Sequence, residues 1–284
     1  MKLTCLLIFL FGLPYATAAI IYGRDNRIET FASPSALYQK LSKSSAAMVI
    51  KMGIRARNGV ATFDGISYGQ RYGLCEKERF AKQTQVASCS GFLVAKDVIA
   101  TAGHCIQSIW ECDQAAWVFN LKLERASQTD VSVSTKDIYN CKKIIRQRFG
   151  KGDGQDYALI KLDRPVLGAV PVTLSAQAPR PGEPLVMIGH PSGLPQKITD
   201  GAQVLTVKGK TFMANVDAFK ISSGSPVFNA QTGVVLGILV AGNEPDFRAN
   251  SHHGCTEVNQ VEDARGQERI SSFEQFAGFL PKEK

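Results

Sequence analysis

Short apolar runs, separated by polar or glycine-rich turns, recur along most of this chain. Runs of this length bounded by turn residues are typical of β-strands, and 25 glycines supply the turns. The runs outside the motifs discussed below are residues 46–52, 61–68, 117–123, 131–139, 202–207 and 211–214. Near the end, Phe273, Phe276 and Phe279 recur at near-helical spacing, which predicts a terminal helix over about 269–281. The pattern predicts an all-β protein that ends in one helix.

Length and charge narrow the class of protein. The chain has 284 residues, enough for one large β domain or two ordinary ones. A formal charge of +8 permits attraction to acidic surfaces. The basic residues do not form a long block, however, and no basic helix with interleaved aromatic residues accompanies them, so we predict no nucleic-acid partner.

The first residues read as an export signal. Lys2 gives a positive start, Leu3–Leu13 is apolar but too short to span a bilayer comfortably, and Ala16–Ala18 offers small residues for cleavage. No second stretch reaches spanning length. We therefore predict that residues 1–19 are a signal peptide and that the mature protein is secreted or periplasmic, with no membrane partner.

Residues 20–45 form an approach segment with two open interpretations. Ile20–Gly23 is apolar, Arg24–Arg27 is charged, and Ser33–Ser45 is polar. The segment is either an N-terminal arm packed on the domain or a pro-segment removed on maturation. The domain itself is then expected over 46–284.

The cysteines suggest bridges rather than a metal site. Loss of Cys5 with the signal leaves six, which in an oxidising compartment suggests three disulfides with fifteen possible pairings. Zinc at His252, His253 and Cys255 is the alternative. Adjacent histidines cannot easily turn to one ion, and paired Cys-x-x-Cys spacing is missing, so we predict no metal and no cofactor.

A hairpin pattern runs from Cys89 to Cys105 and delivers a histidine at its end. Two apolar runs, Gly91–Ala95 and Val98–Ala102, flank a polar turn, and Thr-Ala-Gly-His-Cys follows with His104. The ends of such a hairpin lie together, so the two flanking cysteines can close a small loop.

Two further motifs follow in chain order. Asp156 opens the apolar string Asp-Tyr-Ala-Leu-Ile-Lys-Leu, which ends at Leu162. Later comes Ser-Ser-Gly-Ser-Pro-Val-Phe, in which Ser223 precedes Gly224. Each motif alone could be strand or turn chemistry, but a histidine, an aspartate and a serine, each in such surroundings, form a strong joint signal.

These three motifs resemble the histidine, aspartate and serine signatures of bacterial trypsin-like serine peptidases of the chymotrypsin superfamily. The Gly-His-Pro-Ser-Gly string at 189–193 and the Ser-Gly-Ser-Pro core are similar to the glutamyl-endopeptidase branch. The resemblance covers about 75–245. It implies two antiparallel six-stranded β-barrels, one over about 46–165 and one over about 166–265, with the C-terminal helix behind them. It also implies a monomer that acts on protein or peptide substrates.

The resemblance assigns roles to these residues. His104 and Asp156 would lie on the first barrel, and Ser223, on the second, would attack a carbonyl while His104 takes its proton. Backbone N–H groups of Ile221 and Ser223 would stabilise the oxyanion. A bridge between Cys89 and Cys105 is also implied. The pairing of Cys75, Cys112, Cys141 and Cys255 stays open, with Cys75–Cys255 and Cys112–Cys141 as the working assignment.

Two positions depart from the family. The residue two before the serine is normally glycine, and Ile221 stands there; a β-branched residue strongly opposes positive φ. An exported binding protein that kept the fold and lost turnover is therefore the alternative to a serine endopeptidase. The carboxylate that would pair with a new N-terminus is replaced by Ser222, so that mode of maturation is excluded.

The family pattern also locates the pocket for the side chain before the scissile bond. Its residues here are Asp217, Ala218, Leu239 and Gly242. Asp217 at the floor predicts a preference for arginine or lysine. Glutamate-cutting relatives carry a threonine and a histidine where this chain has Ala218 and Leu239, so glutamate specificity is disfavoured.

Overall fold

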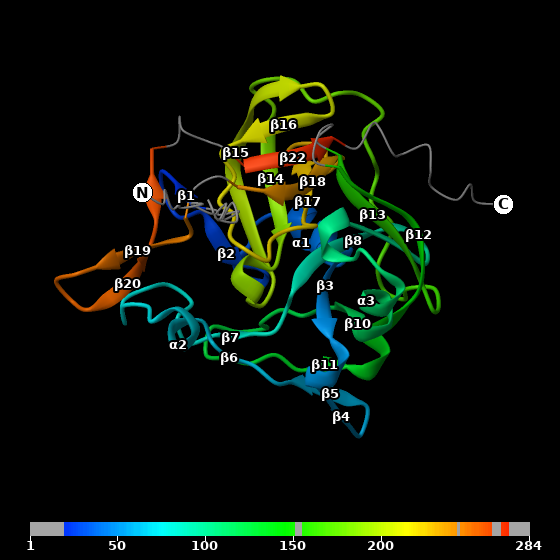
Figure 1. Cartoon of the computed structure of the whole chain (residues 1–284), viewed down its shortest axis with the longest axis horizontal. Helices are drawn as coiled ribbons and strands as arrows, with labels where there is room; N and C mark the ends of the chain where they lie inside the picture. Colours follow the sequence, from blue (N-terminus) through cyan, green and yellow to red (C-terminus); the bar gives the residue numbers. More distant parts are fainter. Residues whose placement is uncertain (1–19, 151–154, 243–244, 263–267, 273–284) are drawn as a thin grey trace, which may run out of the picture.

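Two β-barrels packed side by side make up the body of the computed structural model (Figure 1), which describes residues 20–150, 155–242, 245–262 and 268–272. The first barrel is closed and antiparallel. Its strands, in order around the barrel, are β10 (Ala115–Phe119), β12 (Ile138–Phe149), β13 (Asp156–Leu162), β9 (Val98–Thr101), β8 (Cys89–Ala95) and β3 (Ser45–Ile50).

The second barrel closes because β14 and β15, which stand at the two ends of its strand order, pair with each other. Its strands in order are β14 (Pro184–Gly189), β17 (Pro226–Asn229), β18 (Val235–Ala241), β22 (Glu268–Ser272), β16 (Thr211–Ala214) and β15 (Lys197–Lys208). An extra strand from the N-terminal arm, β2 (Arg27–Glu29), pairs with the outer edge of β15. The predicted fold class of two antiparallel six-stranded barrels is confirmed.

Alternation along the strands explains where the apolar residues go. In β14, Leu185 and Met187 enter the core of the second barrel, whereas Val186 and Ile188 enter the large cluster that continues into the first barrel. Successive strand side chains point to opposite faces. Because both faces of β14 are buried, this strand reads as a continuous apolar run, and the barrels share one apolar interface.

The predicted C-terminal helix is wrong at its start. Residues 268–272 form strand β22, hydrogen-bonded to β16 on one side and to β18 on the other. Ile270, fully buried, completes the core of the second barrel. Tertiary pairing therefore overrides the helical spacing, and the second barrel extends beyond the predicted limit at 265. The rest of the predicted helix, like the predicted signal peptide at 1–19, lies outside the described residues.

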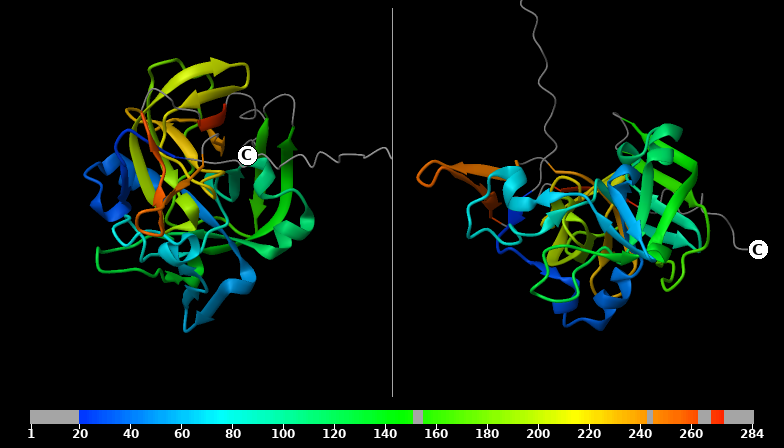
Figure 2. Two further views of the ribbon diagram at one scale, coloured as in Figure 1. Left: turned by 60° about the vertical axis from the view of Figure 1, so that its left-hand side comes forward. Right: turned by 90° about the horizontal axis from the view of Figure 1, so that it is seen from below.

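Smaller elements cover the barrels. Near the first barrel these are the strands β4 (Ile54–Arg57), β5 (Val60–Phe63) and β11 (Val133–Ser134), the β6 (Ile66–Ser67) and β7 (Thr84–Gln85) pair, α2 (Tyr68–Tyr72) and α3 (Ile109–Gln114). A hairpin of β19 (Phe247–Asn250) and β20 (Cys255–Val258) projects from the body (Figure 2). No helix in the described part of the chain is long and apolar enough to cross a membrane.

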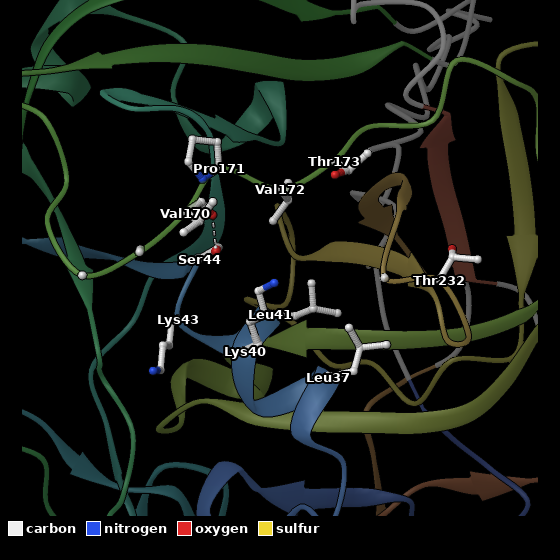
Figure 3. Close-up of a pocket in the computed structure, with 13 residues that line it drawn as sticks. Leu37, Lys40, Leu41, Lys43, Ser44, Val170, Pro171, Val172, Thr173 and Thr232 are labelled. Carbon is white, nitrogen blue, oxygen red and sulfur yellow. Dashed lines mark hydrogen bonds between the residues drawn. The ribbon is translucent and has the colours of Figure 1, made fainter.

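A hollow of about 420 Å³ lies between α1 (Ala36–Ser42) and the segment that connects the barrels (Figure 3). Ser44 Oγ donates a hydrogen bond of 2.6 Å to the carbonyl of Val170 at its edge. Leu37 and Leu41 of α1 line it together with Val172. None of the predicted catalytic residues contributes to this lining.

Candidate active site

The imidazole of His104 is held by the carboxylate of Asp156. His104 lies in the 3-10 turn η3 (Gly103–Cys105) after β9, and Asp156 opens β13, which pairs with β9. Asp156 Oδ2 is 2.7 Å from His104 Nδ1, and Oδ1 accepts the His104 backbone N–H at 3.0 Å. The carboxylate is buried, whereas the imidazole side chain is 29% exposed. Because Nδ1 is engaged, Nε2 is the ring nitrogen left for proton transfer.

The turn that carries His104 depends on a glycine. A Cβ at Gly103 would lie 2.0 Å from the carbonyl oxygen of Arg148, in the neighbouring strand β12. The Gly103 carbonyl accepts a hydrogen bond of 3.0 Å from Gln147 Nε2 in the same strand. The Ala-Gly-His string thus has a packing reason, since only glycine lets the turn approach β12 closely.

Ser223 lies in the loop before β17 and is tied to the first barrel. Its carbonyl accepts a 2.8 Å hydrogen bond from the backbone N–H of Ser90 in β8, and Cys105 Sγ is 3.7 Å from the same oxygen. The following residue, Gly224, has φ of 89°, and a Cβ there would lie 1.9 Å from the Ser90 carbonyl oxygen. The serine loop therefore packs against β8. This strand carries Cys89, which is bridged to Cys105, the residue after His104.

Two backbone N–H groups between Phe219 and Ser225 have no hydrogen-bond partner among the described residues. They belong to Ile221 and Ser223, the two positions predicted to stabilise an oxyanion. The other N–H groups of this loop are paired: Phe219 to Ser222 Oγ, Lys220 to Asp246 Oδ2, Ser222 to the Phe219 carbonyl, Gly224 to that of Leu239 and Ser225 to that of Ser222. Most backbone donors in folded proteins are paired, so two free donors in one loop are available to bind an anion.

Ile221 adopts the backbone conformation that its side chain opposes. Its φ is +75°, Lys220 before it does not have positive φ, and Ser222 N–H donates to the Phe219 carbonyl at 2.9 Å. These features define a type II turn over Phe219–Ser222, which normally has glycine at the third position. Strain of this kind costs about 1–3 kcal/mol. The glycine-like loop conformation is thus present despite the β-branched residue.

The predicted pocket residues are largely buried. Ala218 and Leu239 pack in the core of the second barrel, and Gly242 is buried at the end of β18. Asp217 is 2% exposed, and its carboxylate accepts the backbone N–H groups of Tyr22 (2.8 Å) and Asn26 (2.9 Å). Burial raises the pKa of Asp217 to about 7, although those two hydrogen bonds act in the opposite direction.

Sequence reasoning missed the contribution of the N-terminal arm to this region. Lys197 Nζ is fully buried, where it pairs with Glu29 of the arm at 3.1 Å and bonds Gln83 Oε1 at 2.9 Å. Arg27, also buried, pairs with Asp25 at 2.9 Å. Charged residues are ordinarily read as surface positions, and no pattern in the sequence connects residues so distant, so no signal could have found this network.

Within the described residues there are three disulfides: Cys75–Cys255, Cys89–Cys105 and Cys112–Cys141. Cys89, His104 and Cys105 place their sulfur and nitrogen atoms within 4.8 Å of one another. Because the two sulfurs are joined to each other, neither is a thiolate that could bind a metal. Bridges of this kind are characteristic of proteins in oxidising, extracellular compartments.

Comparisons with known proteins point to one family. Residues 89–238 match the model of the trypsin-like peptidase domain. "Serine protease HTRA1B" of Danio rerio is 30% identical over 179 residues, covering 58% of this chain but only 32% of that relative, so this chain corresponds to about a third of its length.

Two solved structures share the fold. A Glu endopeptidase in complex with MPD has a TM-score of 0.50 at 16% identity, covering 92% of this chain and 97% of that one. Mouse neuropsin, a serine protease, has a TM-score of 0.52 at 14% identity, covering 84% and 92%. Sequence identities this low show a shared fold and nothing further. The match to the domain model covers more than half of the sequence, and this chain belongs to the trypsin-like peptidase family.

Proposed function

We propose that this protein is a serine endopeptidase that hydrolyses peptide bonds through an acyl-enzyme at Ser223. The observation that carries the proposal is the pairing of His104 Nδ1 with Asp156 Oδ2 at 2.7 Å, close to a serine loop with two free backbone N–H groups. Membership of a peptidase family supports protein or peptide substrates.

The mechanism follows from the residue types. A serine hydroxyl is a weak nucleophile at neutral pH, so His104 takes the proton of Ser223 as its oxygen attacks the scissile carbonyl. The Asp156 carboxylate fixes the imidazole tautomer and stabilises the imidazolium. The carbonyl oxygen becomes negatively charged and accepts the N–H groups of Ile221 and Ser223. His104 then protonates the leaving amine, and water releases the acyl group by the same steps in reverse.

The N-terminal arm is proposed to remain in the mature enzyme rather than to leave as a pro-segment. Removal of residues 20–45 would take Glu29 away from the buried ammonium of Lys197 and strip the two N–H donors from Asp217. Breaking a buried pair by removing one partner costs about 3–5 kcal/mol. Cleavage after residue 19 would leave the arm intact.

Specificity is a separate proposal. A basic preference at Asp217 stays a prediction, but the carboxylate is buried and both of its oxygens already accept hydrogen bonds from the arm. Cleavage profiling with a peptide library tests it, and enrichment of arginine or lysine before the scissile bond would support it. We also propose placement in the glutamyl-endopeptidase branch, supported by the His-Pro-Ser-Gly and Ser-Gly-Ser-Pro strings, and a secreted or periplasmic monomer.

Labelling with a fluorophosphonate tests the proposed reaction. The mature protein should be labelled, the Ser223→Ala variant should not, and a Ser127→Ala variant at an exposed serine should behave like the wild type. A folded wild type without labelling would favour the alternative, an exported binding protein of this fold. The strained φ of Ile221 is the observation behind that alternative.

A further inference from the structure

We propose that Ser192 is a positioning residue whose backbone N–H holds the oxyanion-binding peptide in its active orientation. The proposal rests on the proposed function, because it concerns the Ile221 N–H that would bind the oxyanion. It assigns a task to the loop of residues 190–194, which carries no group of the catalytic triad.

The contact between the two loops is direct. Ser192 N–H donates a 2.8 Å hydrogen bond to the carbonyl of Lys220, and Ser192 is fully buried. The Lys220 carbonyl and the Ile221 N–H belong to one peptide unit, and no cis peptide is present among the described residues. In a planar trans peptide these two groups point in opposite directions. The carbonyl is held toward buried Ser192, so the N–H is directed to the other side, where no described residue accepts it.

The alternative orientation of this peptide is easy to define. Rotating the Lys220–Ile221 peptide by half a turn converts the type II turn into a type I turn. Ile221 would then have negative φ, which a β-branched residue prefers. The Lys220 carbonyl would replace the N–H at the oxyanion position and repel negative charge. Local preference of Ile221 therefore favours the inactive orientation, and an outside contact has to oppose it.

Ser192 is fixed firmly enough to provide that contact. The Gln85 side-chain amide donates to the Ser192 carbonyl, and the next carbonyl, of Gly193, accepts the N–H groups of Val86 (2.7 Å) and Ala87 (3.1 Å). Ser192 itself has φ of +53°, a conformation that a serine keeps only when its neighbours impose it. The 190–194 loop is thereby anchored to residues 85–87, outside the serine loop.

A second contact acts on the side chain of Ile221. It packs against an apolar cluster on the first barrel that includes Ala47, Val49 and Ala87. Ile221 thus spans from the second barrel to the first, and its burial there works with the Ser192 hydrogen bond. The orientation of the peptide depends on how these contacts balance the strain at Ile221.

The test removes the backbone N–H of Ser192. Replacing Ser192 by the corresponding α-hydroxy acid turns its amide into an ester, which deletes the N–H and leaves the side chain intact. We expect kcat to fall about tenfold or more, up to the hundredfold to thousandfold that loss of a whole oxyanion donor causes. KM should stay unchanged. A crystal structure of the ester variant should show negative φ at Ile221.

Rescue distinguishes positioning from general damage. Glycine tolerates positive φ, so Ile221→Gly in the ester background should restore much of kcat. Gln85→Met, which removes the donor to the Ser192 carbonyl, should lower kcat in the same way. Gln39→Met is the matched control, because Gln39 also donates its side-chain amide to a backbone carbonyl, that of Ser33, at 2.7 Å.

The outcomes are separable from those of the proposed function. A wild type that fluorophosphonate does not label refutes the proposed peptidase, and the φ of Ile221 in the ester variant still tests the role of Ser192. An active wild type with an ester variant of equal kcat, or with Ile221 still near +75° in that variant, overturns the positioning role. If the ester variant does not fold, Gln85→Met with and without Ile221→Gly gives the same test.

Discussion

Replacement of Asp217 by asparagine should change how stability depends on pH. In the folded protein burial raises the pKa of Asp217 from 3.8 to about 7. Arg27 nearby lowers this pKa and Asp25 raises it, both less than burial does. A shift of this size corresponds to roughly 4 kcal/mol at about 1.36 kcal/mol per pKa unit. That is the upper limit of the effect.

The sign follows from proton binding. Between pH 4 and 7 the folded protein keeps the proton on Asp217, whereas the unfolded chain has lost it. The folded state therefore binds more protons, and stability falls as pH rises through this window. Above pH 7 the full cost of burying the charge is present. Asparagine does not titrate, so this fall should be missing in Asp217→Asn.

The assay is urea unfolding at steps from pH 4 to 8, in a Ser223→Ala background that prevents self-digestion. Asp217→Asn should be the less stable protein at pH 4.5. The NH2 of its amide would face one of the two backbone N–H donors and cannot accept a hydrogen bond from it. The difference should shift in favour of the variant by about 3–4 kcal/mol by pH 8. Titration of Lys197, whose pKa burial lowers to about 8, is common to both proteins and cancels. Titration of Glu268 differs between them, because the charge of Asp217 is one of the causes that raise the pKa of Glu268, after burial.

A control separates this effect from charge removal in general. Asp64→Asn removes a carboxylate that is 53% exposed and paired with Arg55 on the surface. Exposed pairs contribute about 0–1 kcal/mol, so its stability curve should run parallel to that of the parent. Parallel curves for Asp217→Asn as well would refute the reasoning, because they would mean that the buried carboxyl titrates normally.

Two further substitutions test the site itself. Asp156→Asn should keep the fold but lower kcat by about ten-thousandfold, since an amide cannot fix the required imidazole tautomer. Steady-state kinetics measures the loss, and an unchanged melting temperature shows that the fold is kept. A loss of kcat below tenfold would contradict the prediction. Gly224→Ala should abolish labelling of the serine, because its Cβ would lie 1.9 Å from the carbonyl oxygen of Ser90. Gly182→Ala is the control, with a similar φ of 84° but open space around it, and equal losses in the two variants would show that φ alone matters.

The barrels and the pairing of His104 with Asp156 were accessible from sequence because each depends on a short local pattern. The hairpin before His104 and the strand opened by Asp156 are contiguous strings, and the structure brings these two residues together. The predicted terminal helix was wrong over residues 269–272 for the opposite reason. Ile270 is drawn into a barrel by strands more than thirty residues earlier in the chain, and local spacing carries no information about that pairing.

The state of Ile221 and of Asp217 was also beyond sequence reasoning. Their side chains suggested a deformed oxyanion site and a pocket that prefers arginine or lysine. In the structure, Ile221 takes positive φ through contacts with the first barrel and with Ser192. The carboxylate of Asp217 binds the arm. Both outcomes depend on non-local contacts that a single sequence does not reveal.

The pairing of β1 (Ile21–Tyr22) with β21 (Gln260–Val261) has a consequence for synthesis. Most of the described residues lie between these two strands, and the last strand of the second barrel, β22, comes later still. A ribosome therefore releases the first barrel long before the second can close. Because His104 and Ser223 lie on different barrels, the proposed triad cannot assemble in a chain that ends before the second barrel. On the proposed function, the topology delays proteolytic competence until β22 has been synthesised and the second barrel can close.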